Sequence, residues 1–254
     1  MLLEVDHVSM HFGGLVAVSD CTFGVRQGTV TSLIGPNGAG KTTVFNLITG
    51  FLRPTTGRIR YEGRDVTGLS PQRLLRMGVA RTFQNLRLHL QMTVLENVML
   101  TAQRQPGEDM WSLFLRPRMT SRAEAEVRER ALEHLDFVGL ADRAGELADN
   151  LSYAEQKLLS IARILMTEAR LLLLDEPASG LDPDSLRTVL PVVRRLVERG
   201  KTVLLIEHNM DLVKELADEI VFLHQGTVLA QGKPADVMSN AELTAIYFGG
   251  GVTA

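Results

Sequence analysis

The sequence predicts an α/β fold built on a mostly parallel β-sheet. Three apolar stretches, 30–34, 171–174 and 201–206, have the length of buried strands, and segments with helical periodicity follow them. Continuous apolar strands that alternate with helices are typical of parallel sheets. Polar residues stand where these strands end. Because the carboxyl ends of parallel strands meet at one edge of a sheet, we expect a single functional site at that edge.

Size and composition exclude several classes of protein. The chain has 254 residues, 45% of them hydrophobic, and a net charge of −3, which does not favour a broad basic face for nucleic acid. Cys21 is the only cysteine, so an internal disulfide and a thiolate metal cluster are excluded, and a reducing compartment fits. The longest apolar run, 171–174, is far shorter than the roughly 20 residues that span a bilayer. Residues 1–6 lack the features of a signal peptide. Any membrane association is therefore expected to go through a partner.

Further strands are expected outside the three buried ones. Residues 3–8 alternate between apolar and polar, and 16–25 predict two short strands around Ser19 and Asp20. A short strand is expected at 58–62, and a terminal hairpin at 219–223 and 227–231.

The spacing of two histidines near the N-terminus raises the question of a metal site. His7 and His11 lie four residues apart, which on a helix would suggest a pair of metal ligands. On a strand they are about 13 Å apart, so we interpret them as unrelated.

The sequence pattern changes between residues 85 and 150. Strand patterns stop there, and helical patterns separated by polar loops begin. Residues 93–96 and 121–124 each have a capping-box sequence and predict helix starts, the second for a charged helix that ends near residue 137. Residues 105–119 hold an apolar cluster around Trp111, which is either a local core or a docking surface. We interpret 85–150 as a helical insertion in an otherwise α/β chain.

A glycine-rich loop connects the strand 30–34 to an apolar helical segment. It follows the pattern G-x-x-x-x-G-K-T and consists of Gly35, Pro36, Asn37, Gly38, Ala39, Gly40, Lys41, Thr42 and Thr43. Glycines let backbone N–H groups turn inward around an anion, and the first turn of the helix adds unpaired N–H groups. Lys41 can reach the β- and γ-phosphates, and the Thr42 hydroxyl can bind Mg²⁺. This segment, the phosphate loop, therefore predicts a site for a nucleoside triphosphate.

Four polar residues at strand ends complete the predicted site. Asp175 can hold Mg²⁺ opposite Thr42, directly or through water, and Glu176 can orient or deprotonate a water. Gln84 supplies an amide for water or Mg²⁺, and His208 an imidazole that can donate to the γ-phosphate. Singly, each could be a solvated surface group. Together they provide the positioning and charge neutralisation that in-line phosphoryl transfer requires.

Six motifs in this order resemble those of ABC transporter ATPase subunits. They are the phosphate loop (Walker A), Gln84 (Q-loop), 151–156 (signature), 171–177 (Walker B), 179–182 with Asp182 (D-loop) and His208 (switch histidine). The resemblance spans the chain and implies one ATPase domain, 1–254, with a P-loop NTPase core and an antiparallel β layer in 1–84 and 151–254. It implies that 85–150 form a helical subdomain and that Phe12 stacks on adenine.

The same resemblance implies partners. Two ATPase subunits, identical or paralogous, would sandwich two ATP molecules head to tail, each phosphate loop facing the other subunit's signature. Within the family, residues 78–85, 92–98 and 204–210 resemble branched-chain amino acid importers, and 246–249 their larger ATPase subunit. This implies transmembrane permease subunits, an indirect link to a solute-binding protein, and a position at the cytoplasmic face of the cell membrane. The permease contact is expected on 85–150, with Gln84 at its hinge.

Other functions are also compatible with these motifs. Importers for urea, amides or other small acids share the same stretches, and a non-transport ABC protein acting on ribosomes or DNA is a further possibility. A GTPase is not favoured, because the sequence has no Asn-Lys-x-Asp guanine motif.

The signature departs from the common Leu-Ser-Gly-Gly-Gln. Here Ser152 is followed by Tyr153, Ala154 and Glu155, so that Ser152 is a predicted N-cap and Glu155 the third helical residue. The Ser152 hydroxyl, N–H groups and helix dipole would bind the partner's γ-phosphate. The Ala154 methyl could crowd a phosphate oxygen, which predicts slower hydrolysis. A free Glu155 carboxylate would repel the phosphate, and we expect a capping-box bond to the Ser152 N–H to hold it aside.

Overall fold

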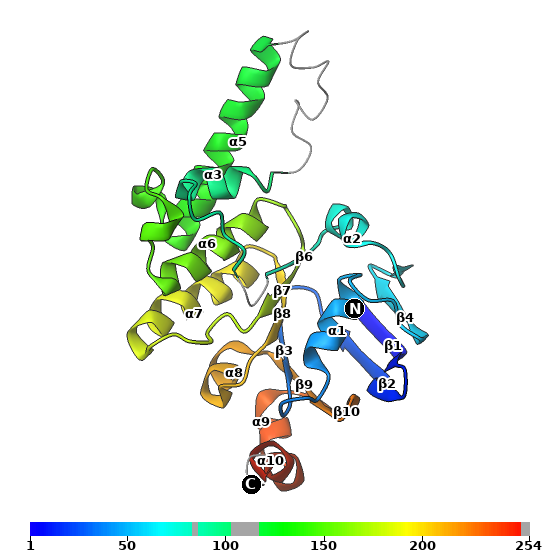
Figure 1. Ribbon diagram of the computed structural model, residues 1–254. Helices are drawn as coiled ribbons and strands as arrows, with labels where there is room; N and C mark the ends of the chain where they lie inside the picture. Colours follow the sequence, from blue (N-terminus) through cyan, green and yellow to red (C-terminus); the bar gives the residue numbers. More distant parts are fainter. Residues whose placement is uncertain (83–85, 103–116, 250–254) are drawn as a thin grey trace. The chain divides into compact units, whose positions relative to one another are not determined.

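The computed structural model describes residues 1–82, 86–102 and 117–249, and the chain divides into two compact units (Figure 1). The first unit holds the described residues of Met1–Arg81, Arg170–Ser179 and Val193–Ala254. The second holds those of Thr82–Ala169 and Gly180–Val192.

A six-stranded sheet with the order β10-β9-β3-β8-β7-β6 forms the centre of the first unit. Its strands are β3 (Val30–Ile34), β6 (Val79–Arg81), β7 (Leu171–Asp175), β8 (Thr202–Ile206), β9 (Glu219–His224) and β10 (Thr227–Gly232). The strands from β9 to β6 are parallel, and β10 pairs with β9 in the predicted terminal hairpin. Every residue of β3, β7 and β8 is buried, which explains why these strands read as unbroken apolar runs. The predicted mostly parallel sheet is confirmed.

A four-stranded antiparallel sheet with the order β2-β1-β4-β5 makes the second layer of this unit. It consists of β1 (Leu3–Phe12), β2 (Leu15–Val25), β4 (Thr56–Tyr61) and β5 (Arg64–Asp65). The prediction of two strands in 16–25 is wrong, because β2 is one continuous strand. Its pairing with β1 is irregular, and His7 and Asp20 have positive φ beside the register shifts. The polar break at Asp20 is thus a local irregularity rather than a turn, and His7 Nδ1 lies 2.6 Å from Asp20 Oδ1.

Helices cover both faces of the six-stranded sheet, and the alternation along β3 shows how. Leu33 belongs to a large apolar core shared with α1 (Lys41–Ile48), α2 (Pro71–Met77) and the antiparallel sheet. Its neighbour Ile34 belongs to a smaller core under α8 (Met210–Leu216), α9 (Pro234–Met238) and α10 (Ala241–Gly249). Successive strand residues point to opposite faces, so one strand serves two cores.

The second unit is helical. It contains α3 (Val94–Met99), α5 (Pro117–Val138), two short 3₁₀ turns η1 (Ala141–Arg143) and η2 (Ala148–Asn150), α6 (Tyr153–Leu165) and the first part of α7 (Pro183–Glu198). Because α6 packs on α3 and α5, this unit is larger than the segment 85–150.

Two helix starts in this unit are predicted from capping-box sequences, at Thr93 and at Ser121. The Thr93 capping box is present, and Glu96 bonds back to the Thr93 N–H. The start predicted at Ser121 is wrong, because α5 already begins at Pro117 and residues 121–124 lie inside it. A capping sequence marks a helix start only where the preceding residues leave the helix. The apolar cluster around Trp111 lies outside the described residues.

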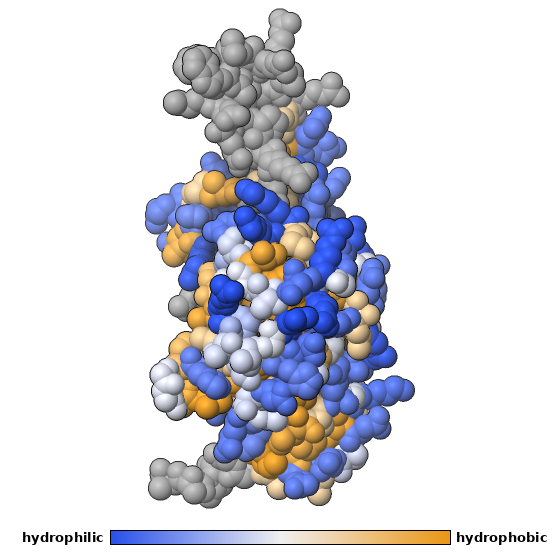
Figure 2. All heavy atoms as spheres, turned by 90° about the vertical axis from the view of Figure 1, so that its right-hand side faces the viewer, coloured by the Kyte–Doolittle hydropathy of each residue, from blue (hydrophilic) through white to orange (hydrophobic). Residues whose placement is uncertain are grey.

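Among the residues that the structure describes, no helix is both long and apolar enough to cross a membrane. The face drawn in Figure 2 is mostly hydrophilic, and its hydrophobic residues form separate patches.

Candidate functional site

The phosphate loop lies between β3 and α1, and its backbone requires glycine at two positions. Gly35 has φ 152°, and a Cβ there would lie 2.0 Å from the carbonyl oxygen of Leu223. Gly40 has φ 100°, and a Cβ there would lie 2.6 Å from the carbonyl oxygen of Ala17. Any side chain would collide with backbone at both positions. The glycines therefore bring this loop into close contact with two neighbouring strands.

Lys41 is the first residue of α1, and its ammonium group folds back over the loop. Nζ donates to the carbonyl oxygens of Gly35, at 2.7 Å, and Pro36, at 2.9 Å. The side chain is buried, and this burial lowers the pKa of Lys41, while the nearby negative charge of Glu176 acts in the opposite direction. An ammonium group has three donors, so one remains to bind a phosphate oxygen.

Glu176 and His208 meet at the carboxyl ends of the neighbouring strands β7 and β8. Glu176 Oε1 lies 2.6 Å from His208 Nε2. Glu176 has φ 48°, a left-handed conformation that costs a non-glycine residue energy and is typical of functional sites. The sequence predicts both residues in the site, and the structure brings their side chains together.

The adjacent Glu207 is buried. It accepts hydrogen bonds from the N–H groups of Ala178, at 2.9 Å, and His208, at 3.3 Å. Burial raises the pKa of Glu207, and these two hydrogen bonds act in the opposite direction. Glu207 thereby ties the turn after β7 to the turn after β8.

Asp175, at the end of β7, is bound by an arginine that the sequence analysis did not single out. Arg81 Nη2 donates to Asp175 Oδ2 at 2.6 Å, and Nη1 donates to Asn46 Oδ1 at 2.6 Å. The guanidinium group also lies over the Phe45 ring, 5.3 Å from its centroid. Both members of the ion pair are nearly fully buried. Ninety-four residues separate Arg81 from Asp175, so no local sequence signal could have paired them.

Two of the three residues predicted to hold Mg²⁺, Thr42 and Asp175, belong to the unit that carries the phosphate loop. Thr42 is exposed in the first turn of α1, and Asp175 stands at the end of β7. The described residues hold no cluster of three or more His, Cys, Asp or Glu that could bind a metal without a ligand's help. One hydroxyl, one carboxylate and phosphate oxygens are the donors that Mg²⁺ prefers. Gln84, the third predicted ligand, lies outside the described residues.

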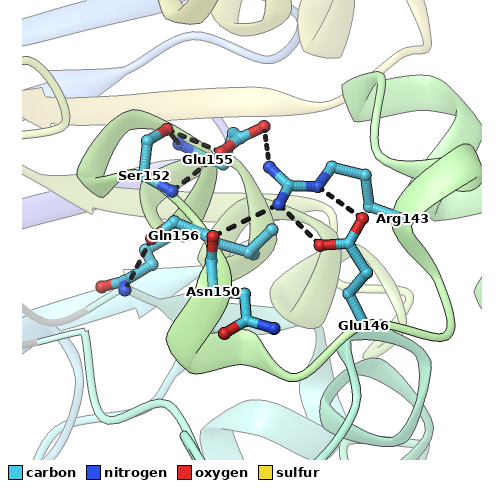
Figure 3. Close-up of polar contacts among 7 residues, drawn as sticks. Arg143, Glu146, Asn150, Ser152, Glu155 and Gln156 are labelled. Carbon is cyan, nitrogen blue, oxygen red and sulfur yellow. Dashed lines mark hydrogen bonds and ion pairs between the residues drawn. The ribbon is translucent and has the colours of Figure 1, made fainter.

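The signature begins α6 with the predicted capping box (Figure 3). Glu155 Oε2 accepts hydrogen bonds from the Ser152 N–H, at 2.8 Å, and from the Ser152 hydroxyl, at 2.7 Å. Its other oxygen, Oε1, accepts from Arg143 Nη1 at 2.6 Å. Partial burial alone would raise the pKa of Glu155, but the bonds from Ser152 and Arg143 outweigh it and lower the pKa. The expected capping-box bond is confirmed, and Arg143 is an additional partner that the sequence analysis missed.

The remaining predicted residues occupy defined positions. Asp182 caps α7, since its Oδ1 accepts from the N–H groups of Asp184 and Ser185, both at 3.0 Å. Tyr153 is 47% exposed, and its ring lies 5.2 Å from Lys157 Nζ. Ala154 is half-buried in the first turn of α6. Phe12 is 45% exposed at the end of β1.

The chain matches the family model described as ABC transporter over residues 18–179. It is 42% identical over 249 residues to the high-affinity branched-chain amino acid transport ATP-binding protein LivG of Salmonella typhimurium, with 98% of each chain covered. It is 43% identical over 251 residues to the corresponding BraF protein of Pseudomonas aeruginosa, again with 98% of each covered.

Solved structures agree with this assignment. A crystal structure of the ADP conformation of an ATP-binding cassette of an ABC transporter aligns with a TM-score of 0.86 at 34% identity, covering 98% of both chains. A dimeric post-hydrolysis cassette bound to ADP and Pi aligns with a TM-score of 0.73 at 26% identity, covering 91% of this chain and 98% of that one. The fold, the phosphate loop and these similarities together establish that the chain belongs to the ABC transporter family of ATP-binding cassettes.

Proposed function

We propose that this chain is the ATP-hydrolysing subunit of an ABC importer for branched-chain or related amino acids. The observation that carries the hydrolytic part is the pairing of Glu176 with His208 on the same unit as the phosphate loop. The names of LivG and BraF support the class of solute. A role on ribosomes or DNA has no support here. The described residues contain no long inserted coiled coil, and the net charge of the chain is −3.

Each residue of the proposed site has a separate role in phosphoryl transfer. Lys41 and the N–H groups of the phosphate loop hold the β- and γ-phosphates, and Phe12 stacks on the adenine. Thr42, Asp175 and Gln84 would hold Mg²⁺, which would neutralise charge that develops on the phosphates. Glu176 orients the attacking water and accepts its proton. His208 fixes the Glu176 carboxylate and can donate from its ring to the γ-phosphate.

We propose that the working unit is a dimer in which the signature contacts the partner's nucleotide. Ser152–Glu155 and Asp182 belong to the second unit, whereas the phosphate loop belongs to the first. In the proposed head-to-tail dimer, with an identical or paralogous subunit, the signature of one subunit contacts the ATP of the other. The dimeric cassette bound to ADP and Pi is a precedent for such pairing.

Transport requires further partners. We propose that residues 85–150, the helical subdomain of the single domain 1–254, contact transmembrane permease subunits, with Gln84 at the hinge. The chain would associate with the cytoplasmic face of the membrane through these subunits, and a solute-binding protein would act on the opposite side.

The substitution Glu176→Gln tests the proposal. It keeps the shape of the side chain and removes its basicity, so the variant should bind ATP, accumulate as a closed dimer and lose nearly all turnover. Turnover in the assembled complex and dimer formation by sedimentation are the measurements. Glu198→Gln, at the exposed end of α7, is the matched control and should behave as wild type. Near-normal turnover of Glu176→Gln would contradict the assignment.

A transport measurement tests the solute. Cells that carry the complex should take up labelled leucine, isoleucine or valine in a manner that depends on Glu176. Uptake of urea or short amides instead would assign the complex to a different solute class.

A further inference from the structure

Arg143 is at the centre of a polar network beside the signature (Figure 3). Nε and Nη2 donate to the two oxygens of Glu146, at 3.1 and 2.6 Å. Nη1 donates to Glu155 Oε1 at 2.6 Å, and Nη2 also donates to the carbonyl oxygen of Asn150 at 3.2 Å. The guanidinium group therefore binds two carboxylates and one carbonyl at once, which only the planar fork of arginine allows.

Backbone hydrogen bonds hold the segment that carries Arg143 against the start of α3. The N–H of Val94 donates to the carbonyl oxygen of Glu146 at 2.8 Å, and the N–H of Leu95 to that of Ala144 at 3.0 Å. The N–H of Ala148 donates to the carbonyl oxygen of Met92 at 2.9 Å. Arg143 is thus presented from a fixed backbone, and its position does not depend on Glu155 alone.

The Ser152 hydroxyl shares its acceptor with the backbone. Glu155 Oε2 accepts hydrogen bonds from both the N–H and the hydroxyl of Ser152, while Oε1 accepts a hydrogen bond from Arg143. A glutamate at this place brings a full negative charge next to the group that should meet a γ-phosphate. That charge would repel the phosphate unless a cation compensates it and holds the carboxylate to one side.

We propose that Arg143 is a positioning residue of the signature. It pairs with Glu155, compensates its charge and keeps the carboxylate at the rear of the capping box. Arg143 and the Ser152 N–H then keep the carboxylate in place when the Ser152 hydroxyl rotates from Glu155 Oε2 to the γ-phosphate held by the partner subunit. This inference rests on the proposed role of the signature in binding the partner's ATP, and it adds a residue that lies outside all six motifs.

The proposal makes a conditional prediction about Arg143→Met. In a chain with Glu155, the substitution leaves the signature carboxylate without its guanidinium, so the apparent KM for ATP in the assembled complex should rise about tenfold, equivalent to about 1.4 kcal/mol. In a chain that carries Glu155→Gln, the same substitution should change KM by less than about twofold, because no charge remains to compensate. Added salt should reduce the rise in KM that Arg143→Met causes in the chain with Glu155, because screening by salt replaces part of the arginine's role.

Two controls separate this role from a loss of folding. Arg130→Met removes another arginine of the same unit, one that pairs with Glu168, and should leave KM unchanged. Melting temperatures of all variants measure structural damage directly. If Arg143→Met raises KM equally with Glu155 and with Gln at that position, or leaves KM unchanged in both, the proposal is wrong.

A further variant distinguishes failure of this inference from failure of the proposed function. Ser152→Ala should weaken ATP-dependent dimerisation if the signature binds the partner's nucleotide. If Ser152→Ala has no effect on dimerisation or turnover, the proposed role of the signature fails. If Ser152→Ala weakens dimerisation while Arg143→Met does not raise KM, only the role of Arg143 fails.

Discussion

The hydroxyl of Tyr247 donates a 2.7 Å hydrogen bond to the carbonyl oxygen of His208. Tyr247 lies on α10, the last described helix, and its ring meets that of Phe222 edge-on with centroids 6.2 Å apart. Burial and the negative charge of Glu207 raise the pKa of Tyr247, so the hydroxyl keeps its proton at neutral pH. Helix α10 is therefore bonded directly to the backbone of His208.

Tyr247→Phe should slow catalysis more than it destabilises the fold. The variant keeps the ring against Phe222 and loses only the bond to His208, a net cost of about 1 kcal/mol. With the His208 backbone less restrained, kcat for ATP should fall several-fold while KM stays close to wild type. Steady-state kinetics of the assembled complex measure both. Tyr61→Phe removes another tyrosine hydroxyl that donates to a backbone carbonyl, that of Gly78, and is the matched control.

Arg81→Met should strongly destabilise the first unit. It removes the guanidinium from a buried ion pair in which both side chains are less than 10% exposed, 6% and 8%, and such losses cost about 3–5 kcal/mol. Arg60→Met breaks half-exposed pairs with Glu4 and Asp6 and should cost less than about 1 kcal/mol. Urea unfolding compares the two. Equal effects would mean that the Arg81–Asp175 pair adds nothing beyond a surface contact.

Ala154→Gly should raise ATP turnover of the assembled complex. The methyl group of Ala154 lies in the first turn of α6, whose N–H groups are proposed to face a phosphate. Glycine removes the crowding at a cost in helix stability of about 1 kcal/mol. A fall in turnover without a fall in melting temperature would show that crowding is not the effect of this alanine.

Glu207→Gln should change the pH dependence of stability in one direction. Burial raises the pKa of folded Glu207 above its ordinary value of 4.5, so the folded chain binds this proton more tightly than the unfolded chain. Its contribution to stability is present below the unfolded pKa and is lost as the pH rises through the folded pKa. Glutamine does not titrate, so the free energy of unfolding of Glu207→Gln relative to wild type should increase from mildly acidic to neutral pH.

Urea unfolding over that pH range tests this expectation. Glu198→Gln, an exposed glutamate on α7, should give a difference that does not vary with pH. A pH-independent difference for Glu207→Gln as well would show that the folded pKa of Glu207 is not raised.

The predictions that the structure confirmed rest on short-range patterns. Buried strands such as Leu171–Asp175 read as apolar runs because both of their faces are covered, and the capping boxes at Thr93 and Ser152 lie within four residues. The same locality explains the errors. Residues 121–124 carry a capping sequence inside a longer helix, and the polar pair Ser19 and Asp20 bends one strand instead of separating two.

The sequence by itself determined the phosphate loop, the strand-end carboxylates and the order of the motifs, because each of these is local or lies at a strand end. Only the tertiary structure decided which side chains hold the site in place. Arg81 meets Asp175, Arg143 meets Glu155, and Tyr247 meets the carbonyl of His208. Each pair joins elements whose contact depends on how strands and helices pack, and neither propensity nor periodicity carries that information.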